Sequence, residues 1–375
     1  MKIGLLTYYG DLNCGTNLQA YACLLTLRKT FPMDDVEVIP LHGFDPPGVH
    51  PYFSHFTILS LYHDFVRIRK YSSFVNDLLK VKKDLVIKDV NRALSYIEKR
   101  SYDMIFVGSD TILELDRIKD GSPLSLYWLS PQIKAKKILL AASSKNVRYD
   151  DLSDTQKTFM KTTLDDFTGF GVRDENTANL ITSYIQKEHV QLIPDPTFCL
   201  DIDDQITTDY LDKKGVSIPQ KSLLFHTTKS DNGWAKPAAD AYRKKGYKIY
   251  SLRPVLWADE ILNDMSPLEQ LGIYKYFECV VTHRFHDAVF SFKNKTPMLL
   301  YTPGGFLSGN DGKTKFTHLL DSFDLLESNY MRDPQKDILN KLDAAIDSFN
   351  SKKDKIESQL NHNKEQFETY INQFK

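Results

Sequence analysis

The sequence predicts an α/β protein with two Rossmann-like domains, each built around a parallel β-sheet. The chain has 375 residues, enough for two or three domains with sizeable cores. Short apolar runs alternate with segments of helical periodicity, an order typical of parallel sheets. A polar stretch at Asp201–Lys221 separates two such series. We therefore expect domains at 1–205 and 206–332, facing a cleft, and a charged helical tail at 333–375.

The first domain is expected to begin with a strand, a polar turn and a helix. The strand is the apolar run Lys2–Tyr8, and Gly10–Gly15 forms the turn before the helix. Gly43–Tyr71 is aromatic and broken by proline, which indicates a packed insertion. The other strands expected here are Val36–Leu41, Asp103–Val107, Lys137–Ala142, Gly169–Arg173 and Val190–Ile193. Helices are expected at Asp84–Arg100 and Ser153–Asp166, and a further helix should follow the strand that ends at Arg173 and extend to about Ile185.

The second domain is expected to repeat this alternation after the polar connection. Because strand ends and helix starts point into the crevices of such sheets, the residues at these junctions are candidates for ligand contact. The elements expected are strands at Ser222–Thr227, Tyr247–Leu252, Cys279–Thr282 and Met298–Tyr301, and helices at Ala235–Lys245, Pro267–Tyr276 and Phe285–Phe292.

Composition excludes several classes of protein. The 48 Lys and Arg residues nearly balance the 49 Asp and Glu residues, so no overall basic field would attract nucleic acid or an anionic membrane. No apolar run approaches the length of about 18 residues that a membrane span needs, and Ile3–Tyr9 ends too soon for a signal peptide. We expect a cytoplasmic protein, with peripheral contact at the inner face of the membrane left open.

The Cys and His residues give no clear metal-binding pattern. The four cysteines lie far apart without a CxxC pair, which argues against a zinc cluster or a disulfide framework. Four histidines of the insertion are irregularly spaced, so a structural role or contact with an acceptor is favoured over a metal. These residues are Cys14, Cys23, Cys199 and Cys279, and His42, His50, His55 and His63.

The turn after the first strand is a candidate ligand site. Asn13, Gly15 and Thr16 lie at the start of the predicted helix, where backbone N–H groups favour an anion. Neither GxGxxG nor the GxxxxGK[ST] of a P-loop is present. A simple turn with a helix cap explains the same residues about equally well.

Five further candidates stand at the ends of predicted strands of the first domain. An Arg at such a junction suits a phosphate or carboxylate, because its guanidinium donates two parallel hydrogen bonds. A surface Arg paired with a neighbouring acid is the simpler alternative, and an Asp between two prolines is more often a turn residue. The five are Ser109, Asp110, Ser143, Arg173 and Asp195.

The strongest local signal is VVTHRFHDAVFSF at Val280–Phe292, where a buried strand runs into His283, Arg284, His286 and Asp287. Histidine can transfer a proton near neutral pH, and Arg supplies charge for an anionic substrate. Two His residues also suggest a metal, but no third ligand is obvious nearby. Alternatively, one His caps the helix and the other is a core residue.

The glycine-rich loop Gly304–Phe316 ends in Lys313 and Lys315. A flexible loop with ammonium groups beside a cleft would hold an anion, although most exposed lysines are simply solvated. The charged tail is expected to be a helix that packs one face against the domains.

At this point the chain resembles the polysaccharide pyruvyl transferase family. The resemblance extends from residue 1 to about 325, and its specific segments are Gly10–Ala22 and Val280–Ser291. The motifs occur in the family's order: GDLNCGTNLQAYA (10–22), GSD (108–110), AAS (141–143), GVRDENT (171–177), DPTF (195–198) and VVTHRFHDAVFS (280–291).

The resemblance implies a fold similar to that of GT-B glycosyltransferases and the transfer of pyruvyl from phosphoenolpyruvate to two sugar hydroxyls as a ketal. The acceptor would be a cell-surface polysaccharide or its lipid-linked precursor, and no metal or organic cofactor would take part. By motif position, His286 would be catalytic and Arg173 would bind the donor. Lys315, with Lys313 as the second choice, and Arg284 would assist.

The chain departs from the family's pattern at several positions. The Arg-Glu pair reads Arg173-Asp174, the segment GSDTIL has Thr111 and Leu113 where the family has Gln and Trp, and Asp287 replaces a small residue.

The sequence is also compatible with two rival functions. One is a nucleotide-sugar-dependent glycosyltransferase of the same architecture, and the other is a sugar- or partner-binding relative without activity.

Overall fold

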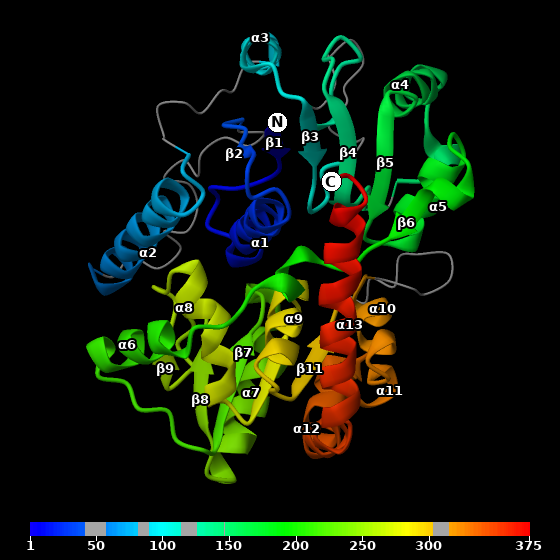
Figure 1. The fold of residues 1–375 in the computed structure, drawn as a ribbon. Coiled ribbons are helices and arrows are strands. Elements are labelled where there is room, and N and C mark those ends of the chain that lie inside the picture. The colour runs from blue at the N-terminus through cyan, green and yellow to red at the C-terminus, as the bar shows by residue number, and fades with distance from the viewer. Residues whose placement is uncertain (42–57, 82–89, 114–125, 146, 303–314) are drawn as a thin grey trace. The chain divides into compact units, whose positions relative to one another are not determined.

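A computed structural model describes residues 1–41, 58–81, 90–113, 126–145, 147–302 and 315–375 (Figure 1). The chain divides into two compact units. Unit 1 comprises Met1–Gly48, Tyr71–Leu200 and Asn363–Lys375, and unit 2 comprises Val49–Lys70 and Asp201–His362. This division differs from the expected boundaries at 205/206 and 332/333, because part of the insertion belongs to unit 2 and the tail is shared between the units.

Unit 1 contains a six-stranded parallel sheet in the order β2-β1-β3-β4-β5-β6. Every residue of β3 is buried, as expected for a strand covered on both faces. The strands are β1 (Lys2–Leu6), β2 (Asp35–Val38), β3 (Met104–Val107), β4 (Lys136–Ala142), β5 (Phe167–Val172) and β6 (Val190–Leu192). The helices are α1 (Cys14–Thr30), α3 (Val90–Arg100), α4 (Asp154–Leu164) and α5 (Glu175–Thr182).

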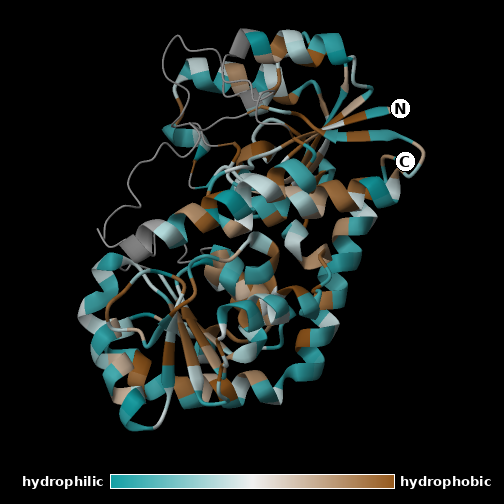
Figure 2. Ribbon diagram, turned by 90° about the vertical axis from the view of Figure 1, so that its left-hand side faces the viewer, coloured by the Kyte–Doolittle hydropathy of each residue, from teal (hydrophilic) through white to brown (hydrophobic). Residues whose placement is uncertain are grey.

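Unit 2 contains a second six-stranded parallel sheet in the order β12-β11-β10-β7-β8-β9. Its strands are β7 (Ser222–His226), β8 (Lys248–Ser251), β9 (Glu260–Ile261), β10 (Cys279–Thr282), β11 (Met298–Tyr301) and β12 (Tyr330–Met331). Its helices are α6 (Asp204–Lys214), α7 (Asn232–Lys244), α8 (Pro267–Gly272), α9 (Phe285–Lys293), α10 (Lys315–Ser322), α11 (Leu326–Asn329) and α12 (Pro334–Ser351). Hydrophobic residues are concentrated along the strands (Figure 2), and two buried clusters form the cores.

The division between the units falls within two further helices, α2 (Ile58–Asp77) and α13 (Lys353–Asn372). The tail is helical, as predicted, and its last turns belong to the core of unit 1. Tyr370 donates a hydrogen bond to the Leu139 carbonyl at 2.8 Å. A Cβ at Gly171 of β5 would lie 2.6 Å from the Tyr370 ring, so glycine leaves the room that this packing needs.

The polar segment that was expected to connect the domains is not a simple linker. Its residues Asp204–Lys214 form α6. The Asp203 side chain caps this helix, Gly215 ends it with φ of 67°, and Tyr210 and Leu211 are buried. A short buried face is thus enough to fold a segment of mostly polar composition.

In each sheet the strand order reverses beside a central strand. In unit 1 the chain runs from β1 to β2 on one side and then returns to β3 on the other. In unit 2 it runs from β7 through β8 to β9 on one side and then returns to β10 on the other side of β7. Ligands of open α/β sheets bind outside the carboxyl ends of the strands at such switch points. A ligand site is therefore expected at the ends of β1 and β3 and at those of β7 and β10.

Candidate active site

In unit 1 the turn after β1 lies beside the end of β3. The Asn13 side chain accepts a hydrogen bond from the Gly15 N–H at 3.1 Å and so caps α1. The Thr16 hydroxyl donates to Asp110 Oδ2 at 3.3 Å. The structure thus brings Thr16 next to Asp110, and Asn13 and Gly15 lie at the start of the same helix. Asn13 caps a helix, as the simpler interpretation of the turn predicted.

Arg173 follows β5 directly, and its side chain is only 5% exposed. Its Nη1 donates to Asp195 Oδ2 at 3.1 Å, and its Nη2 lies 3.6 Å from Asp110 Oδ1. Burial opposes the guanidinium charge, but Asp110 and Asp195 outweigh this effect and raise the pKa of Arg173. Asp195 also accepts a hydrogen bond from Gln19 Nε2 at 2.7 Å. Arg173 is therefore held in a fixed position by two carboxylates of its own unit.

The two serines among the candidates lie at the ends of β3 and β4. The Ser143 N–H donates to the Asp110 carbonyl at 2.9 Å, and the Ser143 carbonyl accepts from the Leu113 N–H at 3.0 Å. Ser109 is completely buried. These contacts fix the loop that carries Asp110. In unit 1, Thr16, Asp110, Arg173 and Asp195 therefore form one connected polar cluster.

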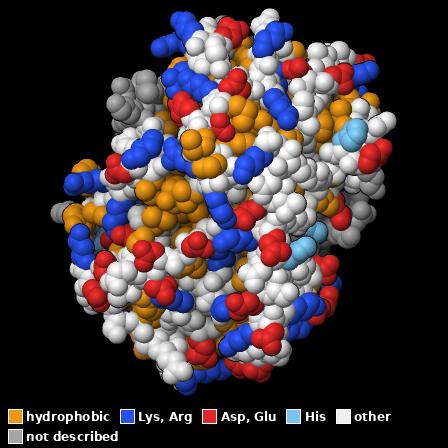
Figure 3. Space-filling view, in the orientation of Figure 1, with side chains coloured by type: hydrophobic (Ala, Val, Ile, Leu, Met, Phe, Trp, Pro, Cys, Tyr) orange, Lys and Arg blue, Asp and Glu red, His pale blue; other side chains and the backbone are white. Residues whose placement is uncertain are grey.

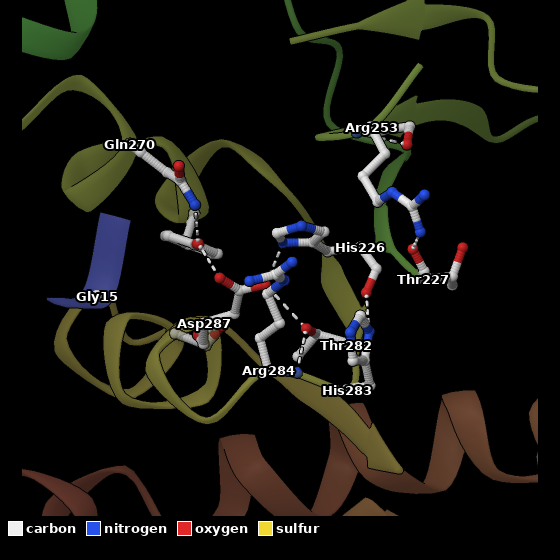
Figure 4. A network of polar contacts seen from close by, with 12 residues as sticks. Gly15, His226, Thr227, Arg253, Gln270, Thr282, His283, Arg284 and Asp287 are labelled. Carbon is white, nitrogen blue, oxygen red and sulfur yellow. Dashed lines mark hydrogen bonds and ion pairs between the residues drawn. The ribbon is translucent and has the colours of Figure 1, made fainter. Parts of the chain in front are cut away.

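In unit 2 the switch point carries a network centred on Asp287 (Figure 4). Its carboxylate is 2% exposed and lies in the first turn of α9. Asp287 Oδ2 lies 2.6 Å from His226 Nδ1 and accepts from the Thr282 hydroxyl at 2.8 Å. Asp287 Oδ1 accepts from the Tyr274 hydroxyl at 2.7 Å. His226 and Thr282 are register partners at the ends of β7 and β10, so the sheet itself places them together.

The surroundings determine the charge of this network. Burial opposes the ionisation of Asp287, but His226, Arg284 and the hydroxyl of Tyr274 hold the pKa of its carboxyl well below the usual range. Burial lowers the pKa of His226, although Asp287 counteracts this effect. Asp287 is therefore ionised and His226 neutral at pH 7, with the proton of His226 on Nδ1.

His283 lies next to His226. Its Nδ1 is 2.9 Å from the His226 carbonyl oxygen, which can only accept, so Nδ1 of His283 carries the proton. Burial lowers the pKa of His283 to about 4, and a proton on His226 or the charge of Arg284 acts in the same direction. His283 is neutral at pH 7. Nearby, Arg253 Nη1 donates to the Thr227 carbonyl at 2.7 Å (Figure 4).

His286 and Lys315 meet at one aromatic ring. The centroid of the His286 ring lies 5.4 Å from that of Phe285, and Lys315 Nζ lies 5.5 Å from the Phe285 centroid. His286 is half-buried in the first turn of α9, whereas Arg284, just before this helix, and Lys315, at the start of α10, are exposed. Three predicted site residues of unit 2 are thus gathered at the starts of two helices.

The remaining predicted residues have different outcomes. Lys313 lies outside the described residues, as do His42, His50 and His55. Arg173 belongs to unit 1 and His286 to unit 2, so their meeting in one cleft stays a prediction. The sequence reasoning missed His226. The signal was available, because the apolar run SLLFH ends on this His at a strand end, in the same way that CVVT runs into His283.

The described residues have neither a cluster suited to a metal ion nor a helix suited to a membrane span. They contain no group of three His, Cys, Asp or Glu side chains that could hold a metal ion. None of their helices is long and apolar enough to cross a membrane. On the face shown in Figure 3, basic and acidic side chains are interspersed, in keeping with the formal net charge of -1.

Comparisons with known proteins bear on both the family and the fold. A family model described as polysaccharide pyruvyl transferase matches residues 13–304, more than half of the chain. No curated protein sequence matches. Among solved structures, a UDP-GlcNAc 2-epimerase from Neisseria meningitidis bound to UDP-GlcNAc has 11% identity and a TM-score of 0.54, covering 95% of this chain and 94% of its own.

Two further structures give similar values. The UDP-GlcNAc 2-epimerase from Methanocaldococcus jannaschii has 10% identity and a TM-score of 0.53, with 92% of this chain and 93% of its own covered. The wall teichoic acid polymerase TagF has 12% identity and a TM-score of 0.53, with 100% and 87% covered. At such identities the likeness shows the fold alone, and it confirms the predicted GT-B-like class.

Proposed function

Because the chain belongs to the polysaccharide pyruvyl transferase family, we propose that it transfers pyruvyl from phosphoenolpyruvate to two hydroxyls of a sugar and forms a cyclic ketal. The acceptor is a cell-surface polysaccharide or its lipid-linked precursor. The reaction takes place in the cytoplasm, and peripheral contact at the inner face of the membrane stays open. Phosphoenolpyruvate is the donor substrate, and no metal or organic cofactor takes part.

One observation carries this proposal beyond the family. In unit 2 the His286 ring and Lys315 Nζ both lie beside the Phe285 ring, and Arg284 directly precedes Phe285 in the chain. Phosphoenolpyruvate carries a carboxylate and a phosphate beside an electron-rich vinyl carbon. Cations that hold the two anionic groups and an acid that reaches the vinyl carbon are the groups such a donor requires. Arg173 would add a fixed guanidinium from unit 1.

The chemistry assigns these residues distinct tasks. His286 donates a proton to C3 of phosphoenolpyruvate, which makes C2 electrophilic. A sugar hydroxyl then bonds to C2, the bond from C2 to the phosphate oxygen breaks, and a second hydroxyl bonds to C2. Arg173, Arg284 and Lys315 hold the carboxylate and the phosphate during these steps, so positioning and electrostatics supply most of the rate enhancement. A group that accepts the proton of the first hydroxyl is also required.

Donor choice separates this proposal from its rivals. Calorimetry with the purified chain should show binding of phosphoenolpyruvate and none of UDP-GlcNAc under the same conditions. Phosphate release should then require a sugar acceptor, supplied as a panel of oligosaccharides and lipid-linked fractions, and mass spectrometry of the product should show the ketal. Nucleotide release from a sugar nucleotide, without phosphate release, would instead support a glycosyltransferase. Acceptor binding without turnover of any donor would support a binding protein.

A further inference from the structure

His226 and Asp287 form a buried pair at the switch point of unit 2, and the mechanism above leaves both without a task. His226 is the last residue of β7, and its side chain is 9% exposed. In the part of the chain that the structure describes, the only hydrogen bond of its ring is the one from Nδ1 to Asp287. The other ring nitrogen, Nε2, makes no hydrogen bond in this part of the chain and is not fully buried. It therefore belongs to the exposed part of the ring.

The neighbours of Asp287 fix the orientation of His226. The carboxylate accepts three hydrogen bonds, from His226, Thr282 and Tyr274, and Gln270 Nε2 in turn donates to the Tyr274 hydroxyl at 3.2 Å. A carboxylate held in this way cannot rotate toward other donors. His226 therefore keeps its proton on Nδ1 and presents the lone pair of Nε2 outward.

The charged groups around His226 come from several elements. Asp287 lies on α9, Arg284 just before it, and Arg67 on α2, and the ring of His283 lies 6.0 Å away between centroids. The two cations and the loss of water favour the neutral imidazole, whereas Asp287 favours the imidazolium. The ring is thus neutral before reaction but has a counter-ion ready for an incoming proton, which is the arrangement of a general base.

We propose that His226 is the general base that accepts the proton of the sugar hydroxyl through Nε2, with Asp287 as the positioning residue that fixes its tautomer and stabilises the imidazolium. This inference rests on the proposed function. His286 protonates C3, the first hydroxyl oxygen bonds to C2, and its proton passes to His226. The phosphate leaves with that proton when its bond to C2 breaks. The second hydroxyl bonds to C2 and returns a proton to His286, so both histidines are regenerated.

The test uses a substitution that keeps the structural contact and removes the base. In His226→Asn the amide nitrogen can still donate to Asp287 from the position of Nδ1, but no atom corresponds to Nε2. The matched control is His362→Asn, a substitution of an exposed His of α13. The midpoint of thermal unfolding and the affinity for phosphoenolpyruvate should stay near the wild-type values in both variants. Turnover should fall about 100-fold or more in His226→Asn alone.

Turnover of His226→Asn within threefold of the wild type would overturn the proposal. The pH profile supplies a second measurement. In Asp287→Asn the loss of the carboxylate should move the acidic limb of turnover to lower pH, because the imidazolium has lost its counter-ion. An unmoved acidic limb would contradict the assignment of that limb to His226.

A third measurement does not depend on turnover. Nitrogen NMR of the labelled full-length chain should show the ring of His226 neutral at pH 7 with its proton on Nδ1. A proton on Nε2 would exclude the base role even if no acceptor were known. If the wild-type chain released no phosphate from phosphoenolpyruvate with any acceptor, the proposed function would fail, and the NMR result would still decide whether His226 is arranged as a base.

Discussion

The Nδ1 atom of His226 lies 2.6 Å from Oδ2 of Asp287, although 61 positions separate the two residues in the sequence. Parallel pairing of β7 with β10 sets His226 opposite Thr282, and α9 begins three residues after Thr282. The pair is thus a direct product of the strand order. A buried carboxylate with three donors is also a strong constraint on the fold of this junction.

Removal of the Asp287 carboxylate should destabilise the protein. Asp287→Ala leaves His226 Nδ1, Thr282 and Tyr274 without their common acceptor in a buried site, which should cost about 3–5 kcal/mol of unfolding free energy. Denaturant titration would measure this loss. Asp287→Asn retains the size and one acceptor oxygen and should cost less. Equal stability of Asp287→Ala and the wild type would show that the network contributes nothing to folding.

Arg173 should matter for stability as well as for donor binding. Arg173→Ala leaves the carboxylates of Asp110 and Asp195 without their shared cation, so we expect a loss of about 3–5 kcal/mol in unfolding free energy. Arg173→Lys keeps the charge and should be better tolerated, but it loses the guanidinium that can donate two parallel hydrogen bonds.

Both Arg173 variants should bind phosphoenolpyruvate more weakly in calorimetry, by about 2–4 kcal/mol for Arg173→Ala. Wild-type affinity in Arg173→Ala, with the fold intact by circular dichroism, would remove Arg173 from the donor site.

Lys315 should contribute more to donor binding than Lys313. Lys315 Nζ lies over the Phe285 ring, in the same group as His286. Its ammonium is exposed, so truncation to Ala should weaken phosphoenolpyruvate binding without changing stability. Calorimetry of Lys315→Ala and Lys313→Ala at low ionic strength makes the comparison, because salt screens such contacts. A greater loss in Lys313→Ala would reverse the assignment.

The sequence predicts features that depend on neighbouring residues better than features that depend on contacts between distant segments. Strands buried on both faces, such as MIFV and SLLFH, appear as continuous apolar runs and were located within a few residues. Helix α6 was missed because its buried face is short, with Tyr210 and Leu211 among mostly polar residues. Its Asp203 cap and the terminal Gly215 are local signals that could have indicated a helix.

For the candidate site, the limit was contact between distant segments. Residues at strand ends could be named because parallel sheets place them at one edge. Their partners could not, since the contact of Arg173 with Asp110 and that of His226 with Asp287 depend on which strands are neighbours. Single-sequence periodicity carries no information on strand order. Several candidates do stand at strand ends, and their role in a site stays a prediction, whereas the pairing of charges came only from the structure.

The buried histidines should make stability depend on pH. The pKa of His283 is lowered to about 4 in the fold, whereas an unfolded His titrates near 6.5. Between these values the unfolded chain binds a proton that the folded chain refuses, so the contribution is complete above about pH 6.5 and is lost as the pH falls toward 4. The loss amounts to about 3 kcal/mol at most. His283→Asn keeps a donor for the His226 carbonyl and should unfold with a weaker pH dependence in denaturant titrations across this range. An unchanged dependence would show that the fold does not lower the pKa of His283.

The role of His286 as an acid can be separated from a role in holding the donor. Proton delivery to C3 matters only in the transition state, so His286→Ala should abolish turnover while retaining much of the affinity for phosphoenolpyruvate. His286→Gln should be almost as inactive, because an amide forms hydrogen bonds but supplies no proton at neutral pH. If the imidazolium acted only through its charge, His286→Lys and His286→Arg would retain more activity than His286→Gln. Phosphate release by the purified variants, with an acceptor found in the panel, measures this difference. Near-normal turnover of His286→Gln would show that His286 only positions the donor. The acid would then be another titratable group at the strand ends of unit 2.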